Sequence, residues 1–321
     1  MVKKNASFPV IALTMGDPAG IGPEIAVRAA NDPEIKKLSR IIIYGCPDII
    51  EEASKKFCEG KMPEIVSTGD LKFSEITIGK EDPKCGICAR KAVIKAVKDT
   101  LAGTVDAIVT SPVNKASINI AGIPFTGHTE LIADLCKTKN YAMMQSAGKL
   151  RVAFVTTHIS LKEVCSNVTE ERIIEVAELL YNEIKSENIA HPKLAAAALN
   201  PHAGENGYMG DEDKKTVRPA LEKLHKMGVN IEGPFPPDTL FIEKTRDKFD
   251  GILCMYHDQG HIPFKMLAFD KGVNTTLGLP IIRTSPDHGT AFEIAWKGVA
   301  HTGSLFEAIR LAAKRVKKIK S

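Results

Sequence analysis

The sequence lacks the features that would place the protein in a membrane or on nucleic acid. It contains no run of about 18 apolar residues, so no transmembrane helix is expected. Residues 1–5 do not lead into the apolar core of a signal peptide. The net charge is only +4, from 43 Lys and Arg against 39 Asp and Glu, and the basic residues do not cluster with aromatics. We therefore expect neither a membrane nor a nucleic-acid partner.

Cysteine occurs without the pattern of a disulfide framework. The count of seven is odd, and Cys46, Cys136 and Cys254 lie in apolar runs, which suits a reducing compartment. We therefore expect a cytoplasmic protein. Cys85 and Cys88 form a lone C-x-x-C, which could be a redox pair or half of a zinc site. Since no second pair exists and no strand leads into it, incidental cysteines at the start of a helix are favoured.

A standard nucleotide-binding motif is also missing. The glycine-rich loop at residues 14–24 has glycines at 16, 20 and 22, which is not G-x-G-x-x-G, and no Gly-Lys-Ser/Thr follows. The loop opens a predicted helix, so its backbone N–H groups could hold an anion. It could equally be a tight strand-to-helix turn, and both interpretations stay open.

What the sequence does have is a regular alternation of apolar runs and helical patterns along 321 residues. Strands are predicted at residues 9–14, 40–44, 106–110, 150–156, 193–199 and 251–255, and helices from about 23 and at 47–56, 88–101, 129–135, 170–185, 216–227, 287–295 and 304–318. This order predicts an α/β protein of parallel βαβ units, as two domains or one large unit. Residues 60–82 look irregular or antiparallel.

Three histidines each stand directly after a predicted strand. They are His158 after residues 151–157, His202 after 194–201 and His257 after 252–256. The carboxyl ends of parallel strands converge on one edge of a sheet, so these side chains can meet there. Any one of them could simply cap a loop. Three at equivalent positions favour a divalent metal with open coordination positions.

Cationic and amide side chains follow in the same C-terminal region. A divalent ion can polarise an alcohol or carbonyl oxygen, which suits hydride removal and the decarboxylation of a β-keto acid. An acidic substrate would need cations, and Lys265 and Arg283 lie in apolar contexts with Asn274 between them. Asp258, beside His257, is a candidate proton-handling carboxylate or a turn residue.

A further polar pair opens the predicted helix at 129–135. Thr129 would cap this helix by default. His128, just before it, is a candidate substrate contact if it faces the same edge of the sheet.

Motifs across nearly the whole chain carry a family resemblance. They are Thr14-Met-Gly-Asp-Pro-Ala-Gly-Ile-Gly-Pro-Glu24, Gly122-Ile-Pro-Phe-Thr-Gly-His-Thr-Glu130, Thr156-Thr-His158, Leu199-Asn-Pro-His-Ala-Gly-Glu205, Pro237-Asp-Thr239, Met255-Tyr-His-Asp-Gln-Gly260, Gly278-Leu-Pro-Ile-Ile-Arg-Thr-Ser285 and Asp287-His-Gly-Thr-Ala291. With these segments the chain resembles the 4-hydroxythreonine-4-phosphate dehydrogenase family.

The resemblance implies an isocitrate/isopropylmalate dehydrogenase-like α/β fold with two domains and a crevice between them. We place the first domain at 1–134 with 275–321 and the second at 135–274, carrying the metal histidines. It also implies a homodimer whose active sites use both subunits, so the three histidines need not come from one chain.

The resemblance further implies a role for each candidate residue. His158, His202 and His257 would bind one divalent ion (Zn, Mg, Mn or Co). His128, Thr129, Lys265, Asn274 and Arg283 would bind substrate, and Lys265 and Asp258 would handle protons. The cofactor, NAD or NADP, would bind the loop made of Asp287, His288, Gly289, Thr290 and Ala291.

The substrate depends on the branch of the family. In one branch the 3-hydroxyl of 4-phosphohydroxy-L-threonine is oxidised and CO₂ is lost, in pyridoxal phosphate biosynthesis. In the other, D-threonate or D-erythronate 4-phosphate is oxidised in sugar-acid catabolism. His261 and Ile262 look more like the second branch. We keep the first activity as the leading expectation, because the shared residues support it directly.

Two other classes remain as alternatives. The chain could be a non-catalytic binding protein on the same fold, but every expected site position is retained. It could be a metal-dependent hydrolase using a histidine-bound water, but a hydrolase does not need the loop at 287–291.

Overall fold

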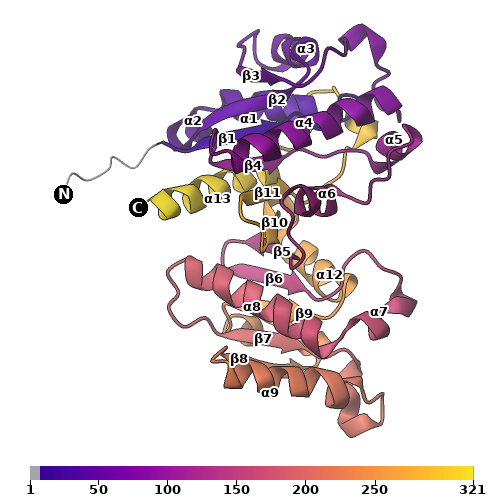
Figure 1. Ribbon diagram of the computed structural model, residues 1–321, viewed down its shortest axis with the longest axis vertical. Coiled ribbons are helices and arrows are strands. Elements are labelled where there is room, and N and C mark those ends of the chain that lie inside the picture. Colours follow the sequence, from indigo (N-terminus) through magenta and orange to yellow (C-terminus); the bar gives the residue numbers. More distant parts are fainter. Residues whose placement is uncertain (1–7, 321) are drawn as a thin grey trace, which may run out of the picture. The chain divides into compact units, whose positions relative to one another are not determined.

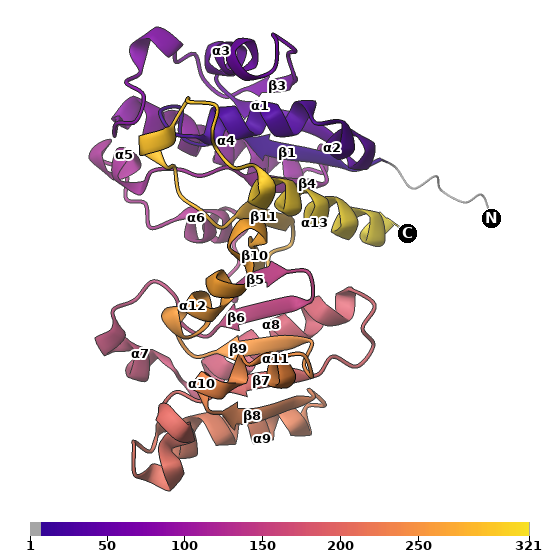
Figure 2. The same cartoon turned by 180° about the vertical axis from the view of Figure 1, so that it is seen from behind.

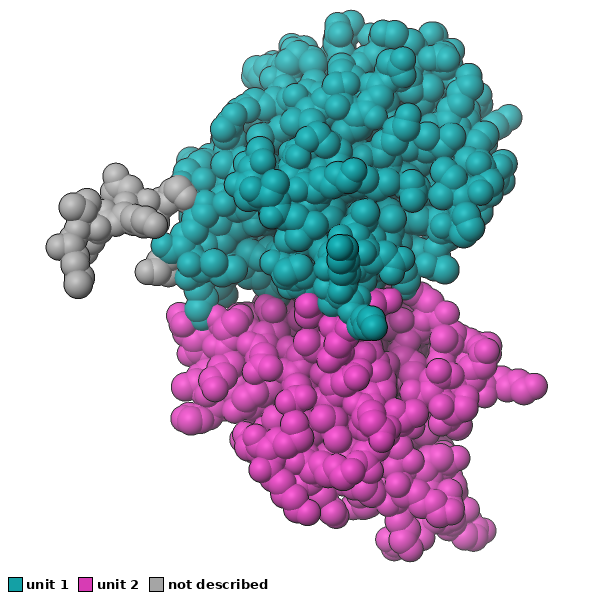
Figure 3. Space-filling view, viewed as in Figure 1, with its two compact units in different colours: residues 1–139, 279–321 teal, residues 140–278 magenta. Residues whose placement is uncertain are grey.

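The structure, a computed structural model, describes residues 8–320, which alternate strands and helices along the chain (Figure 1; Figure 2 gives the reverse side). They form two compact units (Figure 3): unit 1 runs to Lys139 and resumes at Leu279, and unit 2 is Asn140–Gly278. The expected domain boundaries lie a few residues before these. The segment at residues 1–5, expected to lack a signal peptide, lies outside the described residues.

Unit 1 has a parallel sheet in the order β3-β2-β1-β4-β11. Its strands are β1 (Val10–Thr14), β2 (Arg40–Gly45), β3 (Glu64–Ser67), β4 (Ala107–Thr110) and β11 (Ile282–Pro286). β4 is buried along its whole length, as expected for a strand covered on both faces. The predicted strands at 9–14, 40–44 and 106–110 are confirmed. The antiparallel alternative for 60–82 is wrong, since β3 pairs parallel with β2.

Helices cover both faces of this sheet. They are α1 (Gly22–Asn31), α2 (Pro33–Leu38), α3 (Pro47–Phe57), α4 (Pro83–Leu101), α5 (Lys115–Ile120), α6 (His128–Leu135) and α13 (Gly303–Lys320). Figures 1 and 2 show α4 on one face and α1 with α13 on the other. The helix predicted at 287–295 is wrong. A loop and the one-turn η5 (Phe292–Ile294) occupy it, because Ala291 takes a left-handed conformation with φ of 44°.

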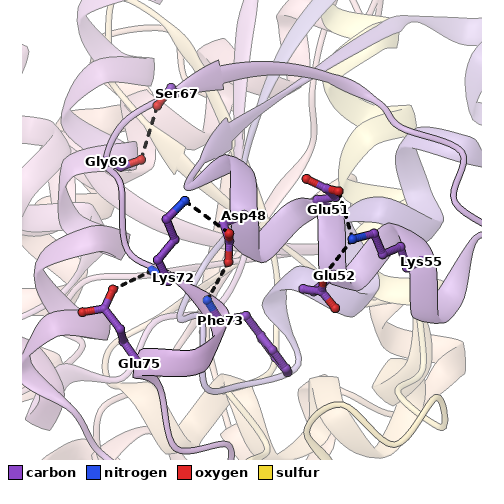
Figure 4. A network of polar contacts seen from close by, with 9 residues as sticks. All are labelled: Asp48, Glu51, Glu52, Lys55, Ser67, Gly69, Lys72, Phe73 and Glu75. Carbon is purple, nitrogen blue, oxygen red and sulfur yellow. Dashed lines mark hydrogen bonds and ion pairs between the residues drawn. The ribbon is translucent and has the colours of Figure 1, made fainter.

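The irregular stretch after β3 is fixed to α3 by polar contacts (Figure 4). Asp48 of α3 accepts a hydrogen bond from the backbone N–H of Phe73 at 2.7 Å and pairs with Lys72 Nζ at 3.3 Å. The bond from Phe73 is the main reason why the pKa of Asp48 lies below its ordinary value. Glu75 in turn accepts from the backbone N–H of Lys72. A segment without a strong predicted element therefore still follows a defined path.

The C-x-x-C cysteines do not pair with each other. Cys88 of α4 forms a disulfide with Cys46, which precedes α3, while Cys85 remains a buried thiol whose pKa burial raises. The interpretation of these cysteines as incidental did not foresee this bridge. It arises because α4 packs on β2, whose end carries Cys46.

Unit 2 has a mixed sheet in the order β10-β5-β6-β9-β7-β8. Its strands are β5 (Ala142–Ala147), β6 (Leu150–Phe154), β7 (Leu194–Ala197), β8 (Ile231–Phe235), β9 (Gly251–Cys254) and β10 (Val273–Leu277). The expectation of parallel pairing throughout is wrong for β10–β5 and β5–β6, which are antiparallel. Only Gly148 and Lys149 separate β5 from β6, and two residues are too few for a crossover.

The helices of unit 2 also lie on both faces of its sheet. They are α7 (Leu161–Asn167), α8 (Glu170–Ser186), α9 (Arg218–Lys226), α10 (Pro237–Leu240), α11 (Glu243–Arg246) and α12 (His257–Ala268), with the irregular turns η2 (Pro201–Gly207), η3 (Asp213–Val217) and η4 (Phe269–Lys271). Figures 1 and 2 show α8 and α9 on one face and α12 on the other. Among the helices of residues 8–320, none combines the length and hydropathy that a bilayer crossing requires.

Candidate functional site

Helix α12 is fixed directly to the strand ends of unit 2. Gln259 in its first turn accepts a hydrogen bond from the Met255 N–H at 2.7 Å and donates to the Ala198 carbonyl at 2.6 Å. Gly260 permits a close approach, because a Cβ there would meet the Phe154 ring at 2.7 Å. The Asp-Gln-Gly sequence after His257 thus holds the histidine in place at the end of β9.

His257 is oriented by its neighbour in sequence. Its Nδ1 lies 2.6 Å from Asp258 Oδ1, and a carboxylate only accepts, so Nδ1 carries the proton. In the neutral ring the lone pair is then on Nε2. A carboxylate bound to one ring nitrogen is the usual support of a metal-binding histidine. The donor chemistry of His257 therefore fits the expected divalent ion.

The other two candidate metal ligands, His158 and His202, lie in different surroundings. His158, just beyond β6, has its ring centroid 5.8 Å from that of His257. His202 lies in η2, where residues 202–206 all have positive φ, and the loop is anchored by Asp213, which accepts from the Leu199 and Asn200 N–H groups. Within residues 8–320 of one chain, no three His, Cys, Asp or Glu side chains form a group that could hold a metal. The three-histidine site stays a prediction, in which the histidines need not come from one chain.

A row of three polar residues runs along one face of α12. His257, His261 and Lys265 are spaced by four residues, so they lie on successive turns of the same side. The His261 ring stacks on His257 with centroids 3.9 Å apart and planes 8° apart. It also stacks on Phe154 at 4.4 Å. Burial, and secondarily His257, lower the pKa of His261 to about 4, so it is neutral near pH 7.

Asn274 lies close to this row through the sheet. In β10 it stands opposite Gln145 of β5, and Gln145 Nε2 is 3.2 Å from His261 Nε2. Asn274 Nδ2 contacts Met143 Sδ at 3.1 Å. Its buried Oδ1 has no hydrogen-bond partner in the described part of the chain. A buried, unsatisfied amide oxygen is costly, which is consistent with a ligand-binding role.

Arg283 is the central cation of unit 1. It lies in β11, is 3% exposed, and donates from Nη2 to Thr110 Oγ1 of β4 at 2.9 Å. Burial lowers its pKa to about 10, and Glu130 acts in the opposite direction. The guanidinium therefore stays charged at neutral pH inside the protein. The expectation that it is not an idle surface charge is confirmed.

His128 faces this cation at the start of α6. Burial, followed by Arg283 and Lys115, lowers its pKa to about 3, which keeps the imidazole neutral. No partner within residues 8–320 reaches the buried His128 Nε2 or Glu130 Oε2. Thr129 lies in the first turn of α6 and the N-cap is Gly127, so the default capping role of Thr129 is wrong. A neutral imidazole beside a buried cation is suited to an anionic ligand.

The predicted cofactor loop is packed against the glycine-rich loop of unit 1. The Ile21 N–H donates to the Thr290 carbonyl at 3.0 Å, and a Cβ on Gly20 would meet Thr290 at 3.0 Å. Residues 16–22 are buried, which favours the tight-turn interpretation over an open anion-binding loop. Gly289, in contrast, is exposed and has open space where a Cβ would be. A flat ligand could approach the loop on that side.

A buried acid lies within the glycine-rich loop itself. Asp17 is fully buried and accepts from the Ala19 N–H at 2.9 Å, while no partner within residues 8–320 reaches its Oδ2. Burial raises its pKa to about 6.

Two neighbours of the candidate residues were missed from sequence. Gln145 and Phe154 contact His261 from other elements, and no local motif marks them. His261 did carry a signal, since it repeats the four-residue spacing from His257 to Lys265. Pro263 within the run concealed the helix that makes this spacing meaningful.

Comparison with known proteins agrees with these features. Over 323 residues the chain is 43% identical to a 4-hydroxythreonine-4-phosphate dehydrogenase of Desulforapulum autotrophicum, covering 95% of each chain. It is 39% identical to a D-threonate 4-phosphate dehydrogenase of Pectobacterium atrosepticum, covering 94% of this chain and 98% of the relative.

A solved structure shares the architecture. The crystal structure of a 4-hydroxythreonine-4-phosphate dehydrogenase from Klebsiella pneumoniae matches with a TM-score of 0.83 at 38% identity, covering 98% of this chain and all of that one (100%). The expected fold class and the expected dehydrogenase class are thereby confirmed, and the hydrolase alternative is set aside. The model of the pyridoxal phosphate biosynthetic protein PdxA family matches residues 36–312, and the chain belongs to this family.

Proposed function

We propose that the protein oxidises the 3-hydroxyl of 4-phosphohydroxy-L-threonine with NAD and then releases CO₂, in pyridoxal phosphate biosynthesis. The observation that carries this proposal is the buried guanidinium of Arg283 beside neutral His128. A buried guanidinium beside a neutral imidazole is suited to binding an anionic ligand, and a phosphorylated acid supplies two anionic groups. The printed activity of the 43% identical relative supports the same substrate.

Substrate binding is assigned to the residues that the family motifs indicate. Arg283, with its planar fork held by Thr110, would bind an anionic group of the substrate bidentately. His128 and Thr129 would add uncharged hydrogen bonds beside it. In unit 2, Asn274 would use its unsatisfied amide oxygen, and Lys265 would contribute a second cation.

The metal and the cofactor have separate assigned residues. His158, His202 and His257 would hold one divalent ion, Zn, Mg, Mn or Co, with one histidine from a second subunit. When bound, this ion would lower the pKa of the substrate hydroxyl and stabilise negative charge on the same oxygen after oxidation. NAD, or NADP, would bind at Asp287–Ala291, where Gly289 is open, and would accept the hydride from C3.

The remaining chemistry is proton transfer. Oxidation at C3 releases the hydroxyl proton to water and leaves a ketone β to the carboxylate, and loss of CO₂ then leaves an electron pair that must be protonated at C2. Lys265 Nζ would supply this proton, or a water hydrogen-bonded to Asp258 would do so. The His257–Asp258 bond would keep the histidine in one tautomer throughout.

A second candidate substrate is supported by a particular residue. D-threonate or D-erythronate 4-phosphate differs from the first substrate mainly by a hydroxyl in place of the amino group at C2. The 39% identical relative is named for D-threonate 4-phosphate. His261, stacked on His257, is the position that suggested this branch from sequence.

The test is a side-by-side turnover assay of the purified protein with the three phosphorylated acids. NADH or NADPH formation and CO₂ release would be followed together, with and without a chelator. We expect the highest kcat/KM with 4-phosphohydroxy-L-threonine and NAD, and no reduced cofactor after metal removal. A higher kcat/KM with D-threonate 4-phosphate would select the second candidate. NADH formation that survives complete metal removal would contradict the metal-dependent mechanism.

We also propose that the protein is a homodimer with shared active sites. Ile262, Met266 and Phe269 are 58%, 83% and 73% exposed on and just after α12, away from the histidine row. Such an unpartnered apolar row is typical of an interface. A second copy is the favoured occupant, because the family resemblance implies a homodimer whose active sites use both subunits.

Sedimentation of wild type and Met266→Glu would test the dimer. The charged side chain should shift the protein toward monomer and lower specific activity, while Lys314→Glu, on the separate helix α13, should leave the dimer intact. A wild-type protein that stays monomeric at micromolar concentration would contradict this proposal.

A further inference from the structure

The His261 side chain is buried and fixed by several contacts, although the proposed mechanism assigns it no role. It is 6% exposed, although it lies one turn from the half-exposed His257. Its ring contacts Phe154 on β6 and His257 on its own helix. Neither residue that the mechanism places on α12 beside it, His257 or Lys265, is buried to this degree.

Two hydrogen bonds also fix the ring plane of His261. Gln145 Nε2 donates to His261 Nε2 at 3.2 Å, which leaves the proton on Nδ1. Nδ1 then donates to the His257 carbonyl at 3.3 Å. The bond from Gln145 requires the tautomer with the proton on Nδ1, and the bond to the His257 carbonyl uses that same proton. The ring therefore cannot rotate without breaking a bond at each nitrogen.

This fixed ring forms the surface on which His257 lies. The two planes are 3.9 Å apart at their centroids and nearly parallel, at 8°. Asp258 fixes the His257 ring from its edge, through Nδ1, but a bond along one edge still permits the ring to tilt. Contact with a flat, immobile face removes that tilt. The edge contact and the face contact together leave one orientation for His257 Nε2.

We infer that His261 is a positioning residue that sets the ring orientation of His257, and that Gln145 holds it for this purpose. The inference rests on the proposed function, because it gives His257 a role in the reaction. It also connects two parts of the site, since Gln145 stands opposite the predicted substrate residue Asn274. Substitutions at 261 should therefore act through His257 and leave substrate binding largely unchanged.

Three variants separate the contacts of His261. His261→Leu removes the flat face and both hydrogen bonds, His261→Phe keeps the flat face alone, and Gln145→Leu frees the ring while leaving it in place. His191→Gln, at an exposed position of unit 2, is the matched control. All are made in the full chain, and thermal unfolding verifies that each variant folds.

The first measurement is the NMR signal of the His257 ring in protein labelled at histidine. In wild type the stacked His261 ring should shift this signal upfield. His261→Leu should abolish the shift, His261→Phe should largely retain it, and His191→Gln should not change it. Titration with Co²⁺ alone adds an independent readout, since the visible spectrum of the bound ion reports the geometry of its ligands.

Steady-state kinetics then test the consequence. Residues that orient a metal ligand typically change activity by 10–100-fold, so we expect kcat to fall at least about 10-fold in His261→Leu with KM within about 2-fold. His261→Phe should recover most of this loss. An unmoved His257 signal in His261→Leu, or a loss confined to KM, would overturn the inference. If wild type reduces no NAD but the His257 signal still moves, the positioning stands and the proposed function fails.

Discussion

The two units hold their candidate site residues in contrasting ways. In unit 1 the charged groups Arg283 and Asp17 are inside the protein, only 3% and 0% exposed, and their pKa values are displaced by burial. In unit 2 the histidines proposed to bind the metal are partly or fully exposed, and His257 is oriented by stacking and by Asp258. The difference teaches that substitutions in unit 1 should affect folding and activity together, whereas those in unit 2 should separate them.

His257→Ala should have the largest effect on activity and only a small effect on stability. Removing a metal ligand forfeits several kcal/mol of charge stabilisation, so kcat should fall about 10³-fold. The free energy of unfolding should change by about 1 kcal/mol or less, because the ring is partly exposed. Turnover assays and urea unfolding measure both. A loss of unfolding free energy as large as the loss of transition-state stabilisation would contradict the proposed difference between the two units.

Arg283→Lys should reduce both the activity and the stability of the protein. The charge remains, but the bidentate fork and the bond to Thr110 are lost, so kcat/KM should fall about 100-fold. Unfolding should become easier by about 1–3 kcal/mol, since buried partners are left unsatisfied. Unchanged kinetics with lowered stability would mean that Arg283 is purely structural.

Asp17 should make the stability of unit 1 depend on pH. Its folded pKa of about 6 exceeds the ordinary 3.8, so the folded state binds the proton more tightly. The resulting stabilisation is complete below about pH 4 and is lost as the pH rises through 6. The difference of about two pKa units corresponds to about 3 kcal/mol.

Urea unfolding of wild type and Asp17→Asn between pH 4 and pH 7.5 would measure this loss. The wild-type free energy of unfolding should fall relative to that of the variant across this range. Parallel pH profiles for the two proteins would show that Asp17 does not titrate as its burial implies.

Asp258→Asn should produce the smallest change. The amide can still hydrogen-bond to His257 but no longer accepts with a full negative charge, so kcat should fall about 10-fold. Stability should stay within about 0.5 kcal/mol, because Asp258 is exposed. An effect as large as that of His257→Ala would instead identify Asp258 as the essential base.

The sequence predicted the elements whose pattern is local and regular. The predicted helix at 170–185 became α8 because its apolar period continues without interruption. α12 was missed because Gly260 and Pro263 interrupt its pattern, although Gly260 is needed there for packing on Phe154. In the β5–β6 hairpin the strand β6 was predicted at 150–156, but β5 was missed because its residues, Ala142–Ala147, include no β-branched or aromatic side chain.

The candidate site residues also divide into those that the sequence could identify and those that it could not. His257, Arg283 and their motif neighbours could be named from sequence because strand ends and family motifs mark them. Gln145 could not, since its role depends on a contact across elements. The burial of Arg283 was anticipated from its apolar context, whereas the contact between His158 and His257 needed the relative placement of β6 and β9.

The arrangement of side chains on α12 predicts that the specific activity depends on protein concentration. One side carries His257 and Lys265, and the other carries the exposed Ile262 and Met266. If a second copy covers the apolar row, subunit dissociation removes support from the same helix that bears the chemistry. Specific activity should then fall on dilution, with a midpoint at the dissociation constant of the dimer, and should return on concentration. Protein concentration would act on this enzyme as an effector does.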